Sequence, residues 1–497
     1  MPLNLSNRDQ TSGHAFYQRR LRAAITRFSV RMKHDDRKQH AALALSLVFV
    51  VLGCGWMALL NVMKPAGLVG ESAIVGNRAT GALYAKIDGR LHPSLNLSSA
   101  RLAIGSAGSP AWVNAEEIGK LPTGPMIGIA GIPDDLAIIG NPLSAWTLCD
   151  TASAPGSIAP PIVTAIAGTL PGAGRAAPMN PSQALLGTHR GSTYLIWNGQ
   201  RSRIELRDRP VTITLGLDPA RVRPVALSNA LFDAMPATEP IVVPAVPGAG
   251  TPSRLLPGAV VGRVLQTRDA TGDISGFYVL LPAGVQRITA FVADLLRTAN
   301  SQGTSEPQVI SPDTLARLPE TDELNIGFYP ADKLEFVDTQ ANPVSCVNWT
   351  KLSTDPTATV TVYSGAGLPT PQHLDPHVVA LVRDERDSDS VQAQQTLMVP
   401  GAANFVATTS AATAADTRES LFWISPQGVR YGIEWDRDTL QALGIDPSRA
   451  VQAPWPIIRT FAAGPAISRA DALLARDAIS PVGLAARLPQ PGDAGDR

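Results

Sequence analysis

The chain has few of the residues that build catalytic and metal sites. Its 497 residues include 3 Cys and 7 His, and aromatic residues make up 5% of the sequence. Three cysteines are too few for a disulfide-rich scaffold, and no Cys-x-x-Cys pair is present for a zinc or redox site. The sequence also lacks a Walker A loop, a His-Glu-x-x-His motif and a Gly-x-Ser-x-Gly motif. These absences exclude the commonest designs of nucleotide hydrolase, zinc hydrolase and serine hydrolase.

Charge is also scarce and unevenly placed. Charged residues make up 17% of the chain, and the formal net charge is zero. Residues 1–40 hold nine Lys/Arg and three Asp, a balance of +6, so the remaining residues carry −6. No basic stretch interleaved with aromatic residues indicates nucleic-acid binding. The 42 Gly and 42 Pro favour many turns and short elements, and therefore a β-rich body over a helical bundle.

One segment is long, apolar and uncharged. Ala41–Met63 has 23 residues, enough at 1.5 Å per residue to cross the roughly 30 Å of a bilayer core. Five basic residues lie between 27 and 38, whereas only Lys64 follows before Arg78. The segment predicts a single-pass membrane protein, with its first forty residues in the cytoplasm and residues 64–497 outside. A secretory signal and a lipoprotein signal at VLGC are the alternatives, but Cys54 lies in mid-segment.

Two short patterns recur in the rest of the chain. The first is a hairpin pattern, an apolar strand with an aromatic residue near its start, a turn Gly and a second strand. It occurs at Leu83–Leu91, Thr193–Arg201, Phe277–Gln286 and Leu421–Arg430. Asp88-Gly89 and Asn198-Gly199 predict tight two-residue hairpins. The second is a short capped helix that ends near Pro, at Val113–Pro122, Leu227–Pro236, Ile310–Pro319 and, in degenerate form, Ala453–Ala462. We interpret the pair as a unit repeated four times, because one hairpin and one helix cannot bury an apolar face alone.

The cysteines outside the membrane segment occupy matching places in this pattern. Cys149 follows Leu121 by 28 residues, and Cys346 follows Leu318 by 28 residues. A pseudo-twofold body, with units one and two in one half and three and four in the other, would bring them together. An extracytoplasmic location permits a disulfide. The alternative is two unrelated buried thiols. The stretches 151–178 and 402–417, poor in charge and rich in Ala, Pro, Gly and Thr, predict loops or insertions between the units.

The basic N-terminal segment predicts a helix over Ser12–Phe28. We expect its apolar residues near one face and its arginines largely elsewhere, the residues concerned being Phe16, Leu21, Ile25 and Phe28, with Arg19, Arg20 and Arg27. Such a helix suits an anionic membrane surface or a cytoplasmic partner, and a basic flank that only orients the anchor is the third reading.

Two polar clusters are weak candidates for metal sites. His373 and His377 flank Asp375 four residues apart, but Pro376 opposes a regular helix, so we interpret the stretch as a surface turn. The acidic residues between 384 and 389 predict a solvated loop. We therefore expect no metal and no cofactor.

Long collinear stretches resemble the EccB family, the single-span membrane component of the mycobacterial type VII (ESX) secretion systems. They are SGHAFYQRRLRAAITRFSVRMKHDD, GALYAKIDGRLHPSLNLSSARL, SNALFDAMPATEPIVVP, SLFWISPQGVRYGI and APWPIIRTFAAGPAISRADALLARD. The resemblance implies an α+β body of four repeat modules around a central β-domain, tied by a Cys149–Cys346 disulfide. It implies a structural subunit of an inner-membrane complex that assembles as a hexamer, and the N-terminal stretch is most similar to the paralogue linked to iron and zinc acquisition.

The same resemblance supplies partners and one disputed activity. The partners are other copies of the chain, the FtsK/SpoIIIE-like ATPase EccC, EccD, EccE and the protease MycP. The family has been described as an ATPase, but no Walker motif here matches that label, so ATP is a cofactor only by family description and we expect EccC to hydrolyse it. A module that binds the cell wall is the remaining alternative function.

The sequence therefore predicts five regions. They are a cytoplasmic segment 1–40, a membrane helix 41–63, a periplasmic half 64–257 with units one and two, a second half 258–485 with units three and four, and a disordered tail 486–497.

Overall fold

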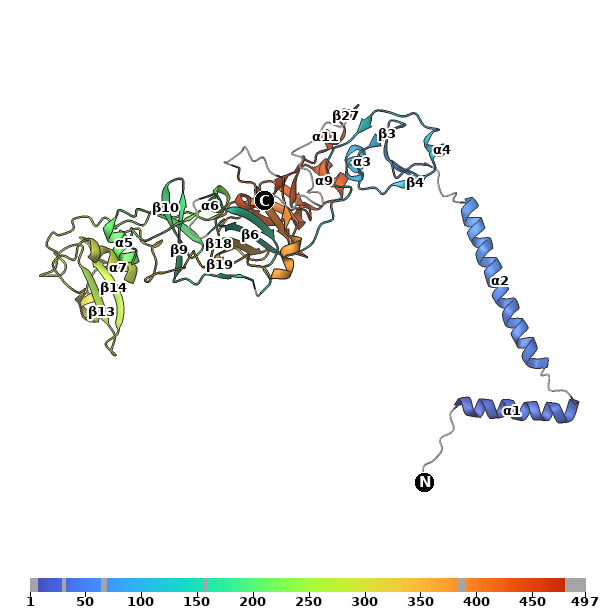
Figure 1. Cartoon of the computed structure of the whole chain (residues 1–497), viewed down its shortest axis with the longest axis horizontal. Coiled ribbons are helices and arrows are strands. Elements are labelled where there is room, and N and C mark those ends of the chain that lie inside the picture. The colour runs from blue at the N-terminus through green and yellow to red at the C-terminus, as the bar shows by residue number, and fades with distance from the viewer. Residues whose placement is uncertain are drawn as a thin grey trace, which may run out of the picture.

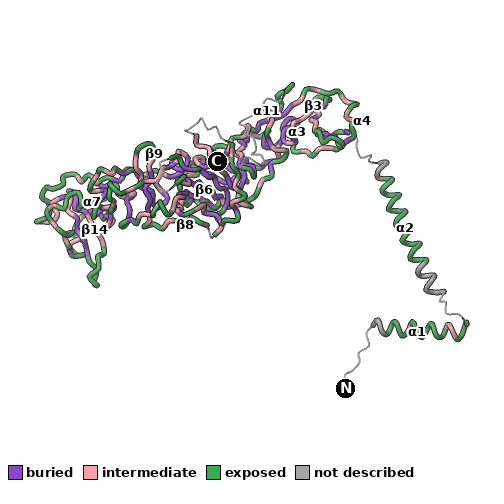
Figure 2. Tube along the Cα trace, viewed as in Figure 1, coloured by how far each residue is buried: buried purple, intermediate pink, exposed green. Residues whose placement is uncertain are grey.

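The computed structural model describes residues 8–28, 33–63, 69–154, 159–172, 174–382 and 390–478. Two helices, α1 (Arg8–Arg27) and α2 (Lys33–Met63), precede a body rich in β-strands (Figure 1). The predicted apolar segment lies within α2. In Figure 2 the described side chains of both helices are almost all exposed, whereas the body has a buried core. The predicted acidic loop 384–389 and tail 486–497 lie outside the described residues.

Four small sheets in the described body share one order of elements. Each begins with three antiparallel strands in chain order, followed by a helix. The strand sets are β1–β3 (Ile74–Asn77, Leu83–Ile87, Arg90–Ser94), β9–β11 (Gln183–His189, Ser192–Trp197, Gln200–Ile204), β13–β15 (Val264–Arg268, Ile274–Leu280, Val285–Ile288) and β22–β24 (Phe405–Thr409, Leu421–Ile424, Val429–Ile433). The helices are α3 (Leu97–Ile104), α5 (Arg209–Leu215), α7 (Ala290–Ala299) and α9 (Arg437–Leu443).

Each sheet is then completed by a parallel strand and a second, shorter helix. The strands that pair with the first strand of their own sheet are β4 (Ala111–Val113), β12 (Val225–Ala226), β16 (Gln308–Val309) and β25 (Val451–Pro454). The helices are α4 (Ala115–Ile118), α6 (Asn229–Ala234), α8 (Pro312–Leu315) and α10 (Trp455–Ile458). The chain then returns in parallel to the third strand, through single bridges or through β5 (Met126–Ile127) and β26 (Ala462–Ala463). We call residues 74–127, 183–237, 264–320 and 405–463 units 1 to 4.

The predicted tight turns and short helices are present. Asp88-Gly89 and Asn198-Gly199 form two-residue hairpins in which all four residues have positive φ, between 46° and 76°. Ser228 Oγ accepts a hydrogen bond from the N–H of Leu231 and so caps α6. Ser311, by contrast, makes no such bond to α8. The degenerate fourth copy still forms α10, because proline is tolerated in the first turn of a helix.

A seven-stranded sheet occupies the middle of the body. Its order is β20-β21-β7-β6-β18-β19-β8, with bounds Val379–Ala380, Gln395–Met398, Ile162–Ala167, Leu143–Thr151, Val344–Leu352, Thr359–Gly365 and Ala176–Pro178. The prediction that 151–178 and 402–417 are loops or insertions is therefore wrong where these stretches form β7, β8 and β22. Strands β7 and β22 are almost entirely buried and rich in small Ala and Thr residues, so they lack the alternation of a half-exposed strand, whereas β8 is a three-residue strand at the edge of the sheet.

The remaining described elements are short. They are β17 (Glu335–Phe336), which joins β9, β27 (Ala475–Arg476), which joins β5, α11 (Arg469–Ala472), and the 3₁₀ helices Gln372–His377 and Pro447–Arg449.

The units are arranged in a row that crosses the sequence order. Figure 1 shows unit 1 at the end reached from α2, followed by unit 4, the central sheet, unit 2 and unit 3. Helix α3 packs on α9, and α5 packs on α7. One apolar core accordingly joins Leu102 to Leu440, and another joins Val211 to Leu295. Each end of the body therefore takes one unit from each side of the predicted division at residue 257.

Candidate functional site

Helix α1 presents its apolar residues differently from the prediction. The helix is continuous from Arg8 to Arg27. At about 100° per residue, Leu21 and Ile25 lie on one face together with Tyr17, while Phe16 lies on the side of Arg20. Phe28 has a φ of 47° and lies beyond the helix. The single face that we predicted is thus wrong for Phe16 and Phe28.

The apolar stripe of α1 is exposed along its length. It consists of Tyr17, Leu21 and Ile25, the last of them 71% exposed. Sequence reasoning missed Tyr17, although the spacing i, i+4, i+8 marks it. Arg19 and Arg20 are exposed, and the side chain of Arg27 lies outside the described residues.

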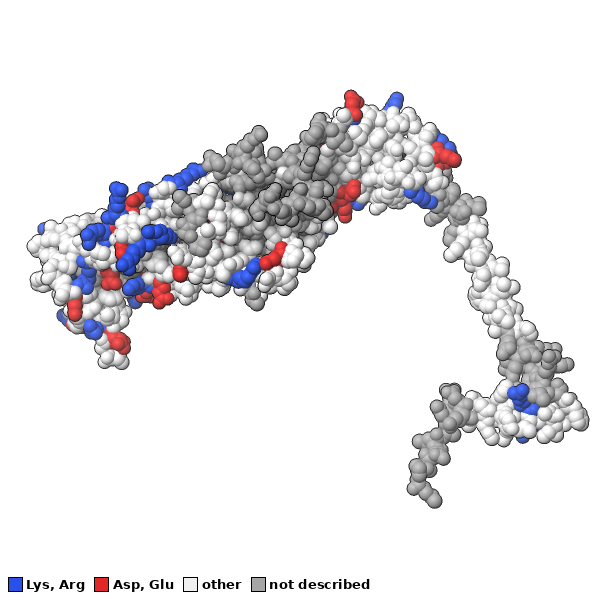
Figure 3. All heavy atoms as spheres, in the orientation of Figure 1, with Lys and Arg blue, Asp and Glu red and all other residues white. Residues whose placement is uncertain are grey.

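Helix α2 contains the one candidate membrane span found in the described residues. The span is His40–Leu59, and none of it is buried against the rest of the protein. Figure 3 shows this stretch free of charged side chains, with basic residues on α1. Twenty residues of an α-helix rise about 30 Å, the thickness of a bilayer core.

The two cysteines of the body form a disulfide at its centre. Strands β6 and β18 pair antiparallel with Cys149 directly opposite Cys346, and the bond joins residues 197 apart in sequence. Both cysteines are fully buried beside Leu374 and Leu397. On the opposite face of the same two strands, the buried Trp146 and Trp349 are also direct partners. The disulfide therefore links the first and second halves of the chain inside one sheet.

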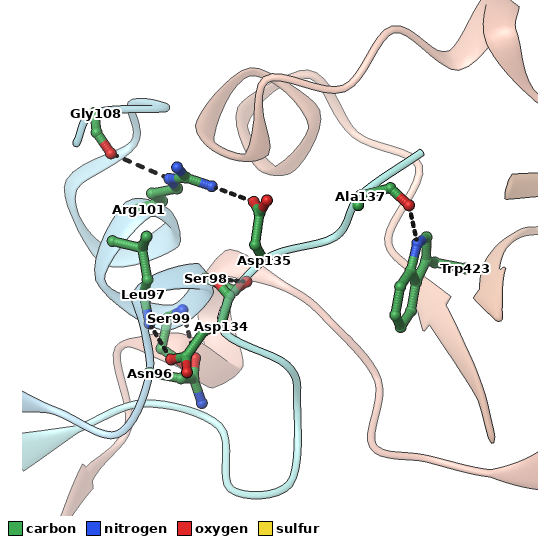
Figure 4. Close-up of polar contacts among 10 residues, drawn as sticks. All are labelled: Asn96, Leu97, Ser98, Ser99, Arg101, Gly108, Asp134, Asp135, Ala137 and Trp423. Carbon is green, nitrogen blue, oxygen red and sulfur yellow. Dashed lines mark hydrogen bonds and ion pairs between the residues drawn. The ribbon is translucent and has the colours of Figure 1, made fainter. Parts of the chain in front are cut away.

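Polar contacts bind the segment that follows unit 1 both to α3 of unit 1 and to unit 4, as Figure 4 shows. Asn96 caps α3 by accepting the N–H of Ser99 at 2.8 Å, and Asp134 accepts the N–H of Leu97 at 3.1 Å. Three residues after Asp134 in the same segment, the carbonyl of Ala137 accepts a hydrogen bond from the indole N–H of Trp423 at 3.1 Å. Since Trp423 belongs to β23, the segment that leaves unit 1 is fixed directly to unit 4.

A second joint connects unit 2 to the central sheet. Asp150 of β6 is buried, and its carboxylate accepts the backbone N–H and the hydroxyl of Ser228, both at 2.7 Å. Burial raises the pKa of Asp150 from 3.8 to about 7, against the lowering effect of these two hydrogen bonds. Nearby, Arg459 of unit 4 pairs with Asp233 of α6. Units 2 and 4 are thus in contact at the C-terminal end of α6.

Comparison with known proteins identifies the family. Residues 3–481 match the family model for the type VII secretion system ESX-1, transport TM domain B. The ESX-2 secretion system ATPase EccB2 of Mycobacterium tuberculosis is 59% identical over 495 residues, which cover 100% of both chains. The chain belongs to the EccB family.

Other EccB proteins are similar over nearly the whole length. The ESX-3 secretion system ATPase EccB3 of Mycolicibacterium smegmatis is 37% identical, over 97% of this chain and 93% of its own. Among solved structures, a chain of an intact ESX-5 inner membrane complex is 35% identical with a TM-score of 0.75, over 99% of both chains. A chain of an EccB3 dimer from the ESX-3 core complex is 33% identical with a TM-score of 0.70, over 81% of this chain and all of that one.

Whole-chain identity also bears on the paralogue. It is 59% with the ESX-2 EccB protein, against 37% or less with the ESX-5 and ESX-3 proteins. The similarity that we expected to the metal-acquisition paralogue rested on the N-terminal stretch and is not supported by the chain as a whole, which favours ESX-2.

These EccB relatives are named ATPases, and the sequence of this chain contains one Gly-Lys pair, Gly119-Lys120, that could belong to a nucleotide site. In a Walker A loop these residues open a helix, where backbone N–H groups cradle phosphate. Here Gly119 closes α4 with a φ of −64°, and the ammonium of Lys120 pairs with Glu117 in the same turn. Gly119-Lys120 therefore has no phosphate-cradling geometry.

The histidine pair of this EccB chain lies in a short helix rather than a simple turn. Gln372–His377 forms one stretch of 3₁₀ helix with Pro376 inside it. Asp375 is paired with Arg175 at 2.6 Å. Within the described ranges, no three His, Cys, Asp or Glu side chains are grouped so that they could hold a metal ion.

Proposed function

We propose that the chain is a structural core subunit of a type VII (ESX) secretion complex in the inner membrane. The observation that carries the proposal is the match, at TM-score 0.75 over 99% of both chains, to a chain of an intact ESX-5 inner membrane complex. The match covers nearly all of the chain. Within the described residues, neighbouring units are joined by shared apolar cores and by polar contacts. Such an arrangement suits a scaffold.

The body of this subunit consists of four repeats related by a pseudo-twofold axis through the disulfide. Support comes from the common order of elements in units 1 to 4 and from their packing. A twofold operation that exchanges unit 1 with unit 3 and unit 2 with unit 4 would also exchange the α3–α9 contact with the α5–α7 contact. It would exchange Cys149 with Cys346, which are already opposite each other.

The N-terminal segment attaches this scaffold to the membrane components. With nine basic residues in the first 40, the segment stays in the cytoplasm, and the body lies in the periplasm. The stripe of Tyr17, Leu21 and Ile25 on α1 docks on other components, for which EccC, EccD and EccE are the candidates. MycP and further copies of the chain contact the periplasmic body.

The test is to identify what co-purifies with the full chain from mild detergent, by mass spectrometry. We expect EccC, EccD and EccE together. A matched chain without residues 1–40 should keep the apolar segment Ala41–Met63 of α2 and the folded body but lose these components. Recovery of all three with the shortened chain would refute docking through α1, and their absence from the full chain would refute membership of the complex.

ATP hydrolysis is a second candidate function, favoured only by the fact that the relatives are named ATPases. Residues 67–497, purified free of EccC, provide the assay. Turnover above that of a mock purification would establish an enzyme with a site unlike any described above. We expect none, because Gly119-Lys120 ends a helix rather than opening one.

A further inference from the structure

Unit 1 carries an exposed tryptophan in a fixed seat. Trp112 of β4 is 44% exposed and lies directly opposite Gly76 of the neighbouring strand β1. A Cβ at Gly76 would lie 2.5 to 2.9 Å from three atoms of the indole ring. The ring therefore rests against the backbone of β1 in space that only glycine leaves, and its other side is open.

The surroundings of this ring combine apolar side chains with two charged ones. Beside Trp112 lies a hollow of about 390 Å³ whose walls include Leu83, Leu95 and Leu97, together with Ser94 and the carboxylate of Asp134. The exposed Arg78 donates a hydrogen bond from Nη2 to the carbonyl of Trp112 at 3.2 Å. An amphipathic indole beside a guanidinium is the combination found at the headgroup level of membranes, where one side of the ring is wet and the other apolar.

The chain also keeps this part of unit 1 near the bilayer. Helix α2 ends at Met63, and the described body resumes at Val69. Five residues join them, which extend to roughly 20 Å at most. Strand β1, on which Trp112 rests, is the first strand after this connection, and β4 and α4 lie at the end of the body that the chain reaches from α2 (Figure 1).

We propose that the surface formed by Trp112, Arg78 and the adjoining hollow, the Trp112 face, rests on the bilayer that α2 spans. The indole ring lies at headgroup level, and Arg78 meets lipid phosphate. The inference depends on the proposed function only in that α2 crosses the membrane. It gives unit 1 a second attachment, which sets the direction in which the row of units leaves the membrane.

Depth-dependent quenching of tryptophan fluorescence tests the proposal. The full chain is placed in phosphatidylcholine vesicles with and without a phosphatidylcholine that carries a nitroxide on its headgroup. Trp112→Phe should reduce the emission lost to the nitroxide per mole of protein, by roughly one eighth of the total emission, since the chain has 8 Trp. Gly76→Ala, which keeps the indole but removes its seat, should give the same reduction with an unchanged circular dichroism spectrum.

The matched control is Trp435→Phe, because Trp435 is 42% exposed but belongs to unit 4. We expect it to leave the loss to the nitroxide unchanged. Equal losses in the Trp112 and Trp435 variants would overturn the proposal. A Trp112 shielded from aqueous acrylamide yet insensitive to the nitroxide would also overturn it, and would indicate a second protein copy on this face. All variants should float with the vesicles, and a wild-type chain that does not float would refute the membrane anchor instead.

Discussion

The pKa of Asp150 is under two opposite influences. Its carboxylate is buried in the central sheet, where desolvation favours the neutral form, yet two hydrogen bonds from Ser228 favour the charged form. Desolvation prevails, so the folded protein binds this proton more tightly than the unfolded chain does. Since Ser228 caps α6, the protonation of Asp150 is coupled to the attachment of unit 2.

This coupling predicts a pH dependence of stability with a definite sign. The pKa is about 7 in the folded state against an ordinary 3.8, so the contribution of Asp150 is fully present below pH 3.8 and is lost as pH rises through 7. The loss is of the order of 4 kcal/mol at most. Thermal melting between pH 4.5 and 8 measures it. Asp150→Asn, which can still accept the N–H of Ser228, should flatten the difference, and parallel curves for the two proteins would contradict the assignment.

At the scale of elements, substitutions in α1 can distinguish docking on a protein partner from contact with an anionic lipid surface. Replacing Tyr17, Leu21 and Ile25 together by Ser should lower the recovery of the other membrane components more than tenfold. The reason is that burying a Leu or Ile side chain is worth about 1.5–3 kcal/mol. Quantitative mass spectrometry of the purified complex measures this. The matched change, Arg19→Gln with Arg20→Gln, should have little effect, whereas a larger effect of the arginines would favour an anionic lipid surface.

The pair of strands β6 and β18 makes the next prediction. In the chain-entropy model, a disulfide closing a loop this long stabilises the fold by roughly 5 kcal/mol. Cys149→Ser should therefore lower the melting temperature by as much as reduction lowers that of the wild type. If neither treatment moves the melting temperature, the bond does not stabilise the body.

Many of these helices and hairpins could be predicted from the sequence, but some strands could not. Turns such as Asn198-Gly199 have local chemistry that determines their shape, so the hairpins were predictable at the right positions. Strands β7 and β22 were not predictable, because their Ala and Thr residues have little strand preference outside a buried sheet, and β8 has only three residues to signal it. Phe16 does not share the apolar face of α1, because the helical period places it on the side of Arg20. The position of Trp112 depends on its contact with Gly76, 36 residues away in the sequence, which no local pattern shows.

For the whole molecule, the crossed order of the units predicts coupling between distant parts of the chain. Leu440→Ala, in unit 4, should cost about 2–5 kcal/mol and reduce the hydrogen-exchange protection of α3 in unit 1 while sparing unit 3. The matched change Leu295→Ala, in α7, should loosen α5 in unit 2 and spare unit 1. Both residues belong to the shared cores described above. Protection lost only within the mutated unit would show that the units are independent.

The packing of unit 1 on unit 4 also determines when, relative to synthesis of the chain, unit 1 can fold. Unit 1 is the first part of the body to be synthesised, yet the core that it shares contains Leu440 and Ala472, which are synthesised more than 300 residues later than its own Leu102. Strand β6 likewise remains without its partner until β18 has been synthesised, and only then can Cys149 pair with Cys346. Unit 1 therefore cannot complete its core until most of the chain exists, and the disulfide can form before that core does.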